Sequence, residues 1–260
     1  MAITLKNKSE LQKMRRAGRI VGDCHCLLRE AIRPGITTAA LDKLVHTYIT
    51  QQNGIPSFLG YPGPTPYPAA TCISVNEEVV HGIPGSRLLQ EGDIVSVDIG
   101  VIWQGYHGDS AWSYPVGAID LKARQLLETT EQTLYHALTF AQVGGRLGDI
   151  SHSIQHFAES HGLSVVRKYT SHGIGKSLHE EPEIRNYGRA GRGVRLREGM
   201  TLAIEPIVTQ GSHAVRECDD GWTAVTVDGT LAAHFEHTIA ITEDNGPEVL
   251  TRQDKLSTHE

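Results

Sequence analysis

The chain contains an internal repeat, and a carboxylate occupies the matching position of each copy. The segment Leu89–Asp98 aligns with Leu196–Glu205, so that Asp98 falls on Glu205. Equivalent residues of two related halves meet where the halves join, and we expect these two acids to face each other there. Facing carboxylates in a protein interior need positive charge nearby, and a bound cation is the usual source. The repeat therefore predicts a metal site at the junction of the halves.

The repeat extends upstream of both acids. The same tripeptide, His-Gly-Ile, begins at His81 and again at His172. Apolar residues recurring every three or four positions predict a pair of helices before each tripeptide. These helices are expected over 9–30, 39–52, 121–141 and 147–161. The copies span roughly 9–116 and 119–241, and we expect a single domain over 1–260 because the halves interleave around one site.

Two hairpins are predicted from β-rich runs that flank turn-forming dipeptides. The first joins 93–102 to 106–116 across Gln104-Gly105, and the second joins 222–227 to 231–241 across Asp228-Gly229. Each half of the chain has a pair of helices followed by antiparallel strands. This order predicts an α+β fold with helices packed outside an antiparallel sheet.

The first hairpin places two acids on one face. With the dipeptide as its loop, Asp98 faces Ala111, and Asp109 lies diagonally on the same side. Diagonal Cβ atoms are about 7 Å apart, which two carboxylates can close around a metal ion. Glu205 ends another apolar strand, and Glu236 lies within the last one. If all four acids converge, two divalent cations cancel their charge.

Three histidines stand in glycine-bearing loops just before the acid-bearing strands: His81, His172 and His179. Glycines let such a loop bring an imidazole close to a metal. Four carboxylates with a histidine suit manganese, cobalt, iron or zinc, whereas calcium prefers oxygen ligands alone. The sequence leaves the choice among these metals open.

Together these residues resemble the type I methionine aminopeptidases, which have the pita-bread fold, and the resemblance covers nearly the whole chain. It implies two pseudo-twofold-related halves with helices outside a curved antiparallel sheet. It also implies that Asp98 chelates one metal and that Asp109 and Glu236 bridge both. The second metal would then be held by His172 and Glu205.

The resemblance also implies the residues that bind the substrate. His81 and His179 match the two histidines of the family that do not ligate metal. The methionine pocket corresponds to Cys72, Tyr67, Leu178 and Trp222, with Tyr61 as the other candidate tyrosine of the proline-rich loop.

The implied reaction is the removal of the initiator methionine from nascent proteins when the second residue is small. Two metals activate a water molecule, and Glu205 shuttles its proton. His179 hydrogen-bonds the carbonyl oxygen as it becomes anionic. His81 contacts the amide nitrogen or helps to protonate the leaving group.

Two departures from the family pattern affect the site. Leu178 stands where an aromatic residue is common, which changes the shape of the methionine pocket. His234 and Phe235 precede Glu236 where a Gln-Tyr pair is familiar, which changes the groups around the ligands.

Three other functions compete with this interpretation. An Xaa-Pro aminopeptidase or prolidase shares the fold, although such relatives usually carry a further N-terminal domain. A metal-free binding protein is disfavoured because every ligand position is filled. A mononuclear iron oxygenase that uses two histidines and one carboxylate is disfavoured because four acids accompany one ligating histidine.

Composition limits the partners. The formal net charge of −6 disfavours nucleic acid, and we expect no specific DNA binding. No apolar run approaches the roughly 18 residues of a membrane span, and no signal peptide is evident. Four cysteines without a disulfide pattern favour a reduced, cytoplasmic protein, and we expect a monomer.

One basic segment departs from the acidic average. Five arginines gather in a glycine-bearing stretch: Arg185, Arg189, Arg192, Arg195 and Arg197. One interpretation is a solvated loop, and the other is transient docking to ribosomal RNA through phosphate attraction.

Overall fold

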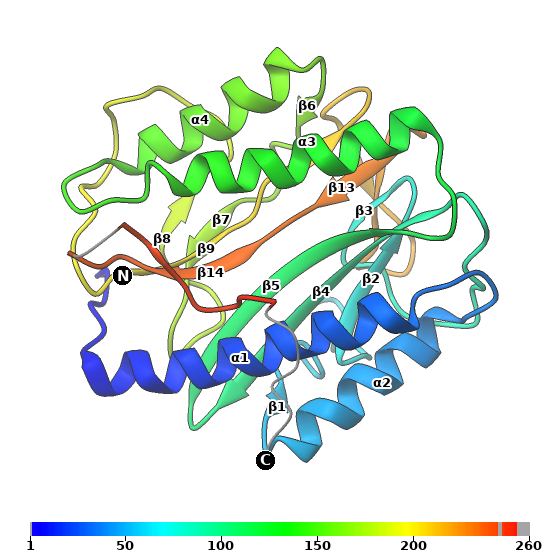
Figure 1. Ribbon diagram of the computed structural model, residues 1–260, viewed down its shortest axis with the longest axis horizontal. Coiled ribbons are helices and arrows are strands. Elements are labelled where there is room, and N and C mark those ends of the chain that lie inside the picture. The colour runs from blue at the N-terminus through cyan, green and yellow to red at the C-terminus, as the bar shows by residue number, and fades with distance from the viewer. Residues whose placement is uncertain (1, 244–245, 254–260) are drawn as a thin grey trace.

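The computed structural model describes residues 2–243 and 246–253, so the ends of the expected 1–260 domain lie outside the described residues. The helices of the described part are α1 (Lys8–Ala31), α2 (Thr38–Gln51), α3 (Leu121–Leu138) and α4 (Leu147–Ser160). They form two pairs, and Figure 1 shows α1 and α2 below the strands and α3 and α4 above them. All four predicted helices are confirmed, with boundaries that differ by a few residues.

Helix α1 begins earlier than predicted because Asn7 caps it. The Asn7 side chain accepts hydrogen bonds from the backbone N–H groups of Ser9 and Glu10, at 3.0 and 3.1 Å. The Glu10 carboxylate accepts in return from the Asn7 N–H at 2.8 Å. This reciprocal capping satisfies amides that the first helical turn leaves without partners.

Among the described residues, the strands form four antiparallel sheets. One runs in the order β1 (Ile55–Pro56), β4 (Ile94–Trp103) and β2 (Thr71–Val75), with β5 (Tyr106–Pro115) beside β4. Another runs β15 (Glu248–Val249), β14 (His237–Ala240), β9 (Thr201–Ile204), β7 (Ser171–Gly173) and β8 (Glu180–Ile184). A third runs β13 (Ala232–His234), β10 (Ile207–Thr209) and β6 (Ser164–Val165). The fourth runs β11 (Val215–Glu217), β12 (Ala224–Thr226) and β3 (Glu78–Val80).

The first predicted hairpin is confirmed in position and register. Strands β4 and β5 pair with Asp98 directly opposite Ala111 and Asp109 opposite Gly100. The turn residues Gln104 and Gly105 have φ angles of 48° and 79°. Positive φ at both central residues matches the twist of paired strands, which explains the tight connection.

The second predicted hairpin is wrong. Strand β12 pairs with β11 and β3, whereas β13 pairs with β10, so the two runs enter different sheets. Gly229 makes the expected turn with a φ of 72°. The run after that turn divides into β13 and β14, and Glu236 lies in the break between them.

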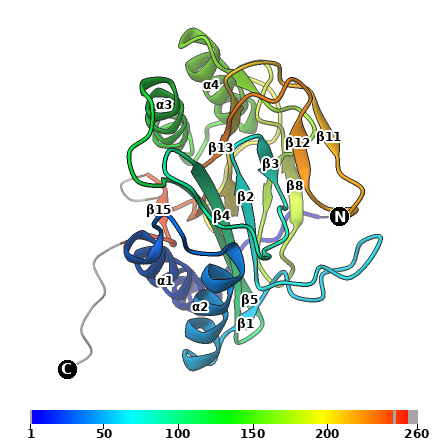
Figure 2. The ribbon, with the colours of Figure 1, turned by 90° about the vertical axis from the view of Figure 1, so that its right-hand side faces the viewer.

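The helices cover one face of the strands. Figure 2 shows α1, α2 and α3 on one side of β4, with β11 and β12 on the other. On β4, Val95, Val97 and Ile99 are fully buried in the main apolar core with residues of these helices. Alternation along the strand turns Asp98 toward the opposite face. Among the described residues, no helix combines the length and apolar composition that a bilayer crossing requires.

Candidate metal centre

One cavity, on the face away from the helices, collects every candidate site residue named from the sequence. It has a volume of about 450 Å³ and is lined from both halves of the chain. The predicted residues in its wall are Tyr61, Tyr67, Cys72, His81, Asp98, Asp109, His172, Leu178, His179, Glu205, Trp222 and Glu236. The wall also contains Phe58, Tyr169 and His234.

Two hydrogen-bonded links hold the acid-bearing strands together. The Glu236 N–H donates to the Ala111 carbonyl at 2.9 Å, and the Ser110 hydroxyl donates to the Glu236 carbonyl at 2.6 Å. The Asp109 N–H donates to the Thr238 hydroxyl at 3.0 Å. These links set Asp109 and Glu236 side by side, although Asp109 lies on β5 and Glu236 in the break between β13 and β14.

The single predicted metal-ligating histidine lies on a strand, which corrects the expectation of a loop. His172 belongs to β7 and pairs with Ala203 of β9, two residues before Glu205. His81 and His179 do lie outside strands, next to β3 and β8. Backbone pairing therefore orients His172, whereas the other two histidines depend on loop packing.

The ligand atoms lie close together. One ligand atom each from Asp109, His172 and Glu236 lies within 4.8 Å of the others. His172 Nε2 is 3.6 Å from Glu205 Oε1. Asp98 lines the same cavity from the neighbouring strand. Side chains of five residues therefore converge on a small buried volume.

Burial raises the pKa of all four carboxyl groups. It raises the pKa of Asp98 to about 7, with the Glu205 carboxylate adding to the rise and the nearby His234 opposing it. Burial likewise holds the pKa values of Asp109, Glu205 and Glu236 well above their ordinary range. Without a cation, the cluster therefore keeps protons that isolated carboxyl groups would lose at neutral pH.

The polar atoms of the cluster fit divalent cations. Asp98 Oδ1, Asp109 Oδ1 and Glu236 Oε1 are buried without a hydrogen-bond partner in the described structure. Such orphaned oxygens are costly unless a cation binds them. Carboxylate oxygens with one imidazole nitrogen form a donor set that manganese, iron, cobalt and zinc accept.

The tautomer of His172 suits a ligand. Its Nδ1 lies 2.8 Å from the Gly173 carbonyl, so Nδ1 carries the proton and Nε2 presents a lone pair. Burial, with a smaller effect of the neighbouring His179, lowers the pKa of His172 to about 3. The imidazole is therefore neutral at physiological pH, the form that binds metal.

Two further histidines stand over the cluster. His179 Nδ1 is 2.7 Å from the Tyr61 hydroxyl, and its ring centroid is 4.4 Å from that of His172. His81 lies edge-on to Tyr169 at 5.2 Å between centroids. Burial lowers the pKa of His81 to about 4. Burial also lowers the pKa of His179, so both histidines are neutral and offer N–H groups to the cavity that they line.

Apolar side chains close one end of the cavity. Tyr67 and Trp222 meet edge to face at 5.1 Å between centroids, and Cys72 pairs with Asp98 across β2 and β4. The Tyr67 hydroxyl donates to the Gly82 carbonyl at 2.8 Å, so its ring faces the cavity while its polar end is satisfied. Leu178 lies in the same apolar cluster.

The structure places both candidate tyrosines of the proline-rich loop in the wall, at different positions. Tyr67 belongs to the apolar end, whereas Tyr61 contacts His179. Tyr169 also lines the cavity, and its buried hydroxyl has no hydrogen-bond partner in the described structure. No sequence motif marks Tyr169. It lies four residues after the end of β6, and only the folded chain places it in the cavity wall.

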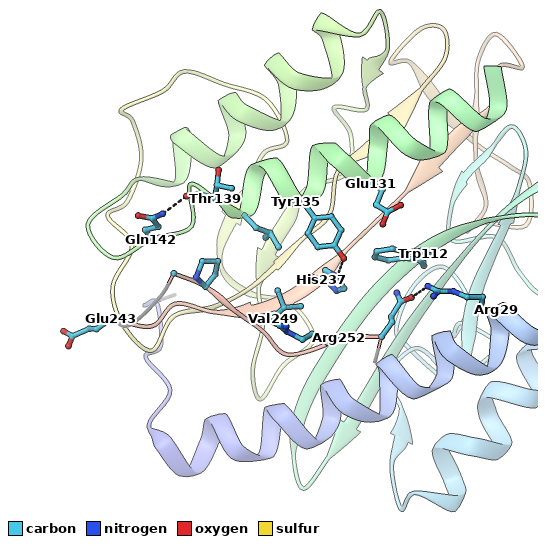
Figure 3. A pocket seen from close by; sticks show the side chains of 14 residues that line it. Arg29, Trp112, Glu131, Tyr135, Thr139, Gln142, His237, Glu243, Val249 and Arg252 are labelled. Carbon is cyan, nitrogen blue, oxygen red and sulfur yellow. Dashed lines mark hydrogen bonds between the residues drawn. The ribbon is translucent and has the colours of Figure 1, made fainter. Parts of the chain in front are cut away.

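A larger cavity of about 1010 Å³ lies on the helix side. Figure 3 shows Trp112 and His237 in its wall beneath α3, with Tyr135 above them. Trp112 lies on the face of β5 opposite to that of Asp109. Among the described residues, the one group of three close metal-ligating atoms lies in the smaller cavity.

Known proteins are similar to this chain over most of its length. The model of metallopeptidase family M24 matches residues 12–243. Methionine aminopeptidase 1 of Bacillus subtilis is 54% identical over 250 residues, which cover 96% of this chain and 99% of that protein. The crystal structure of a methionine aminopeptidase from Thermotoga maritima superposes with a TM-score of 0.94 at 49% identity, covering 96% of this chain and 100% of that one.

A more distant likeness concerns the fold alone. The prolidase from Pyrococcus horikoshii superposes with a TM-score of 0.76 at 22% identity. The match covers 97% of this chain and 64% of that one.

Proposed function

Because this chain belongs to metallopeptidase family M24 and has its pita-bread fold, we propose that it is a methionine aminopeptidase. Its substrate would be the N-terminal methionine of nascent proteins whose second residue is small. The observation that carries the proposal is the cavity in which two buried acids, two half-buried acids and one neutral imidazole adjoin an apolar end. Metal cations would bind the acids and the imidazole, and a methionine side chain would bind the apolar end beside them.

Five residues would hold two divalent cations of manganese, cobalt, iron or zinc. Asp98 would bind one cation, and Asp109 and Glu236 would bridge both. His172 and Glu205 would bind the second. Two dications balance four carboxylates, and they would also satisfy the orphaned oxygens of Asp98, Asp109 and Glu236.

When bound, such cations would supply Lewis-acid activation of a water molecule and of the scissile carbonyl. Glu205 would accept the proton of the attacking water and return it to the leaving amine.

His179 would stabilise the carbonyl oxygen as negative charge develops on it. The Tyr61 hydroxyl can donate to Nδ1, which leaves the proton of the neutral ring on Nε2. An N–H donor of this kind favours the transition state over the ground state. His81, held edge-on by Tyr169, would contact the scissile amide nitrogen.

The apolar end of the cavity would bind the methionine side chain. Tyr67 and Trp222 offer aromatic edges, which attract a thioether sulfur. Cys72 and Leu178 complete this end with small and aliphatic surfaces. The wall beside the acids would then leave room only for a small second residue.

We further propose that the whole chain works as one domain, since both halves supply ligands to one cavity. The buried Cys24 and Cys72 are free thiols, which favours a reduced, cytoplasmic compartment. A monomer suffices because this one chain lines the cavity.

The arginine-rich segment is a proposed docking surface for the ribosome. Its five arginines are all exposed: Arg185, Arg189, Arg192, Arg195 and Arg197. Guanidinium groups attract RNA phosphates, and such contacts weaken as salt rises. Docking there would keep the enzyme near emerging N-termini.

The test is turnover by the chelator-treated full chain after metal is added back. We expect methionine release from Met-Ala-Ser with Mn²⁺ or Co²⁺, and none in the presence of chelator. Preferential cleavage of an Xaa-Pro peptide would instead assign a prolidase-type enzyme. Failure to bind metal or cleave either peptide would assign a binding protein.

A further inference from the structure

His234 lies in the metal centre, outside the proposed ligand set. It ends β13, where it pairs with Ile207 of β10, and only 2% of the residue is exposed. Its backbone is clamped to β5 by one hydroxyl. The His234 N–H donates to Ser113 Oγ at 2.9 Å, and the Ser113 hydroxyl lies 3.0 Å from the His234 carbonyl. These bonds fix the backbone from which the buried ring extends.

The free nitrogen of this ring points at Glu205. His234 Nε2 lies 3.4 Å from Glu205 Oε2 and has no hydrogen-bond partner in the described structure. A shift of a few tenths of an ångström would bring the pair to hydrogen-bond length, about 2.7–3.2 Å. A buried imidazole nitrogen without a partner is costly, so this closure is favourable.

Glu205 stands between two imidazole nitrogens, and only that of His234 is free to donate to its carboxylate. On one side, His172 Nε2 lies 3.6 Å from Oε1 and presents a lone pair, because its Nδ1–H donates to the Gly173 carbonyl. It cannot donate to a carboxylate. On the other side, His234 Nε2 can carry a proton toward Oε2. The two histidines therefore serve different purposes.

Two hydrogen bonds hold the backbone of Glu205 in place. Its N–H donates to the Ser171 hydroxyl at 2.9 Å, and its carbonyl accepts from the Asn186 amide at 2.7 Å. These bonds place the Cα atom but leave the carboxylate free to rotate. One donor at Oε2 would remove that freedom.

We propose that His234 is a positioning residue whose Nε2–H donates to Glu205 Oε2 and turns Oε1 toward the metal shared with His172. The inference rests on the proposed function, because it assumes that His172 and Glu205 ligate a cation. Groups that orient a metal-ligating side chain typically change metal affinity about 10–100-fold when removed.

The test compares a variant that keeps a donor with one that does not. His234→Gln retains an N–H, whereas His234→Leu has similar volume and no donor. Chelator-treated full-length proteins are titrated with Mn²⁺ by calorimetry and with Co²⁺ by visible absorption. We expect the Leu variant to bind one of its two metals about 10–100-fold more weakly. The Gln variant should bind as the wild type does, with unchanged cobalt bands.

His25→Gln is the matched control. His25 is also fully buried, but it lies on the helix side and bonds to Tyr114 and the Ser110 carbonyl. Its substitution should lower stability without changing metal affinity. This control separates loss of a buried imidazole from loss of the proposed donor.

Two results would overturn the proposal. Wild-type metal affinity in the Leu variant would show that the donor has no role. Weak binding with shifted cobalt bands in the Gln variant would show that His234 itself ligates metal. If the Leu variant does not fold, the cobalt bands of the Gln variant decide. Absence of metal binding by the wild type would instead contradict the proposed function.

Discussion

Asp109 and Thr238 are joined by a reciprocal pair of hydrogen bonds between β5 and β14. The Asp109 N–H donates to Thr238 Oγ1 at 3.0 Å, and the Thr238 hydroxyl donates to the Asp109 carbonyl at 2.8 Å. Both residues are buried, and Thr238 lies two residues after Glu236 in the chain. One hydroxyl thereby aligns an acid of the first half with an acid of the second.

Replacing Thr238 by valine should uncouple these strands. Two buried backbone groups would lose their partner, which costs about 1–3 kcal/mol each. We expect a lower urea midpoint and weaker metal binding. Thr130→Val is the control, because that hydroxyl donates to the Leu126 carbonyl within α3 and aligns no ligand. Equal metal affinity in Thr238→Val and the wild type would contradict the aligning role.

Removing a bridging acid should abolish metal binding and activity together. We expect Asp109→Ala and Glu236→Ala to lose nearly all turnover of Met-Ala-Ser and the rise in Tm that Mn²⁺ causes. The metal-free variants should remain folded, because each loses a buried and unsatisfied carboxyl group. Glu183→Gln, at the exposed edge of the same cavity, should keep both properties. Two bound metals with normal turnover in the Ala variants would disprove bridging.

Replacing His179 should separate catalysis from metal binding. His179→Ala removes a proposed transition-state donor, and losses of this kind are about 10²–10³ in kcat. Metal content measured by plasma emission should stay at the wild-type level. Tyr61→Phe should cause a smaller loss, since it removes only the hydroxyl that fixes the His179 tautomer. Loss of metal from the Ala variant would make His179 a ligand.

The stability of the metal-free protein should fall as pH rises above about 7.5. Burial raises the pKa of Asp98 from 3.8 to about 7, so the folded chain holds a proton that the unfolded chain has lost. That contribution disappears as pH rises through the folded-state pKa. The pKa of His172 is lowered from 6.5 to about 3, and those of the buried His25, His81 and His237 are lowered too, so these histidines act oppositely until the unfolded imidazoles are deprotonated at about pH 7.5.

Above about pH 7.5 the slope comes from groups whose pKa values burial holds well above the ordinary range. These are the carboxyl groups of Asp109, Glu205 and Glu236 and the thiols of Cys24 and Cys72, and each contributes up to about 1.4 kcal/mol per pH unit. Urea unfolding between about pH 7.5 and 9 measures it. With Mn²⁺ present the trend should reverse, because metal binds the deprotonated acids. A flat profile in chelator would contradict the raised pKa values.

Charge reversal in the arginine-rich segment should weaken ribosome binding. We expect Arg189→Glu with Arg192→Glu to reduce co-sedimentation with ribosomes, and wild-type binding to fall as salt rises. Arg33→Glu, at an exposed site after α1, is the charge-matched control. Peptide turnover should be unchanged in all of these proteins. Co-sedimentation that ignores both salt and charge would leave the segment as a solvated loop.

Short sequence signals predicted the elements whose structure does not depend on distant contacts. The first hairpin follows from Gln104 and Gly105, whose positive φ angles fix a two-residue turn and hence the register of Asp98 and Asp109. The helices follow from apolar periodicity, although Asn7 moves the start of α1.

Long-range pairing could not be predicted from the same signals. Both strand runs around Gly229 alternate as a hairpin would, yet β12 and β13 join different sheets because more distant partners compete for them. His172 likewise lies on a strand only because β9 pairs with it. The position of His234 beside Glu205 depends on two such strand pairings. The sequence therefore identified His234 only as a departure from the family pattern.

A crystal grown with excess Mn²⁺ and measured for anomalous scattering tests the central claim most directly. We expect two anomalous peaks enclosed by one ligand set: Asp98, Asp109, His172, Glu205 and Glu236. Acids that point apart around a volume without anomalous density would contradict the metal centre and the hydrolase built on it.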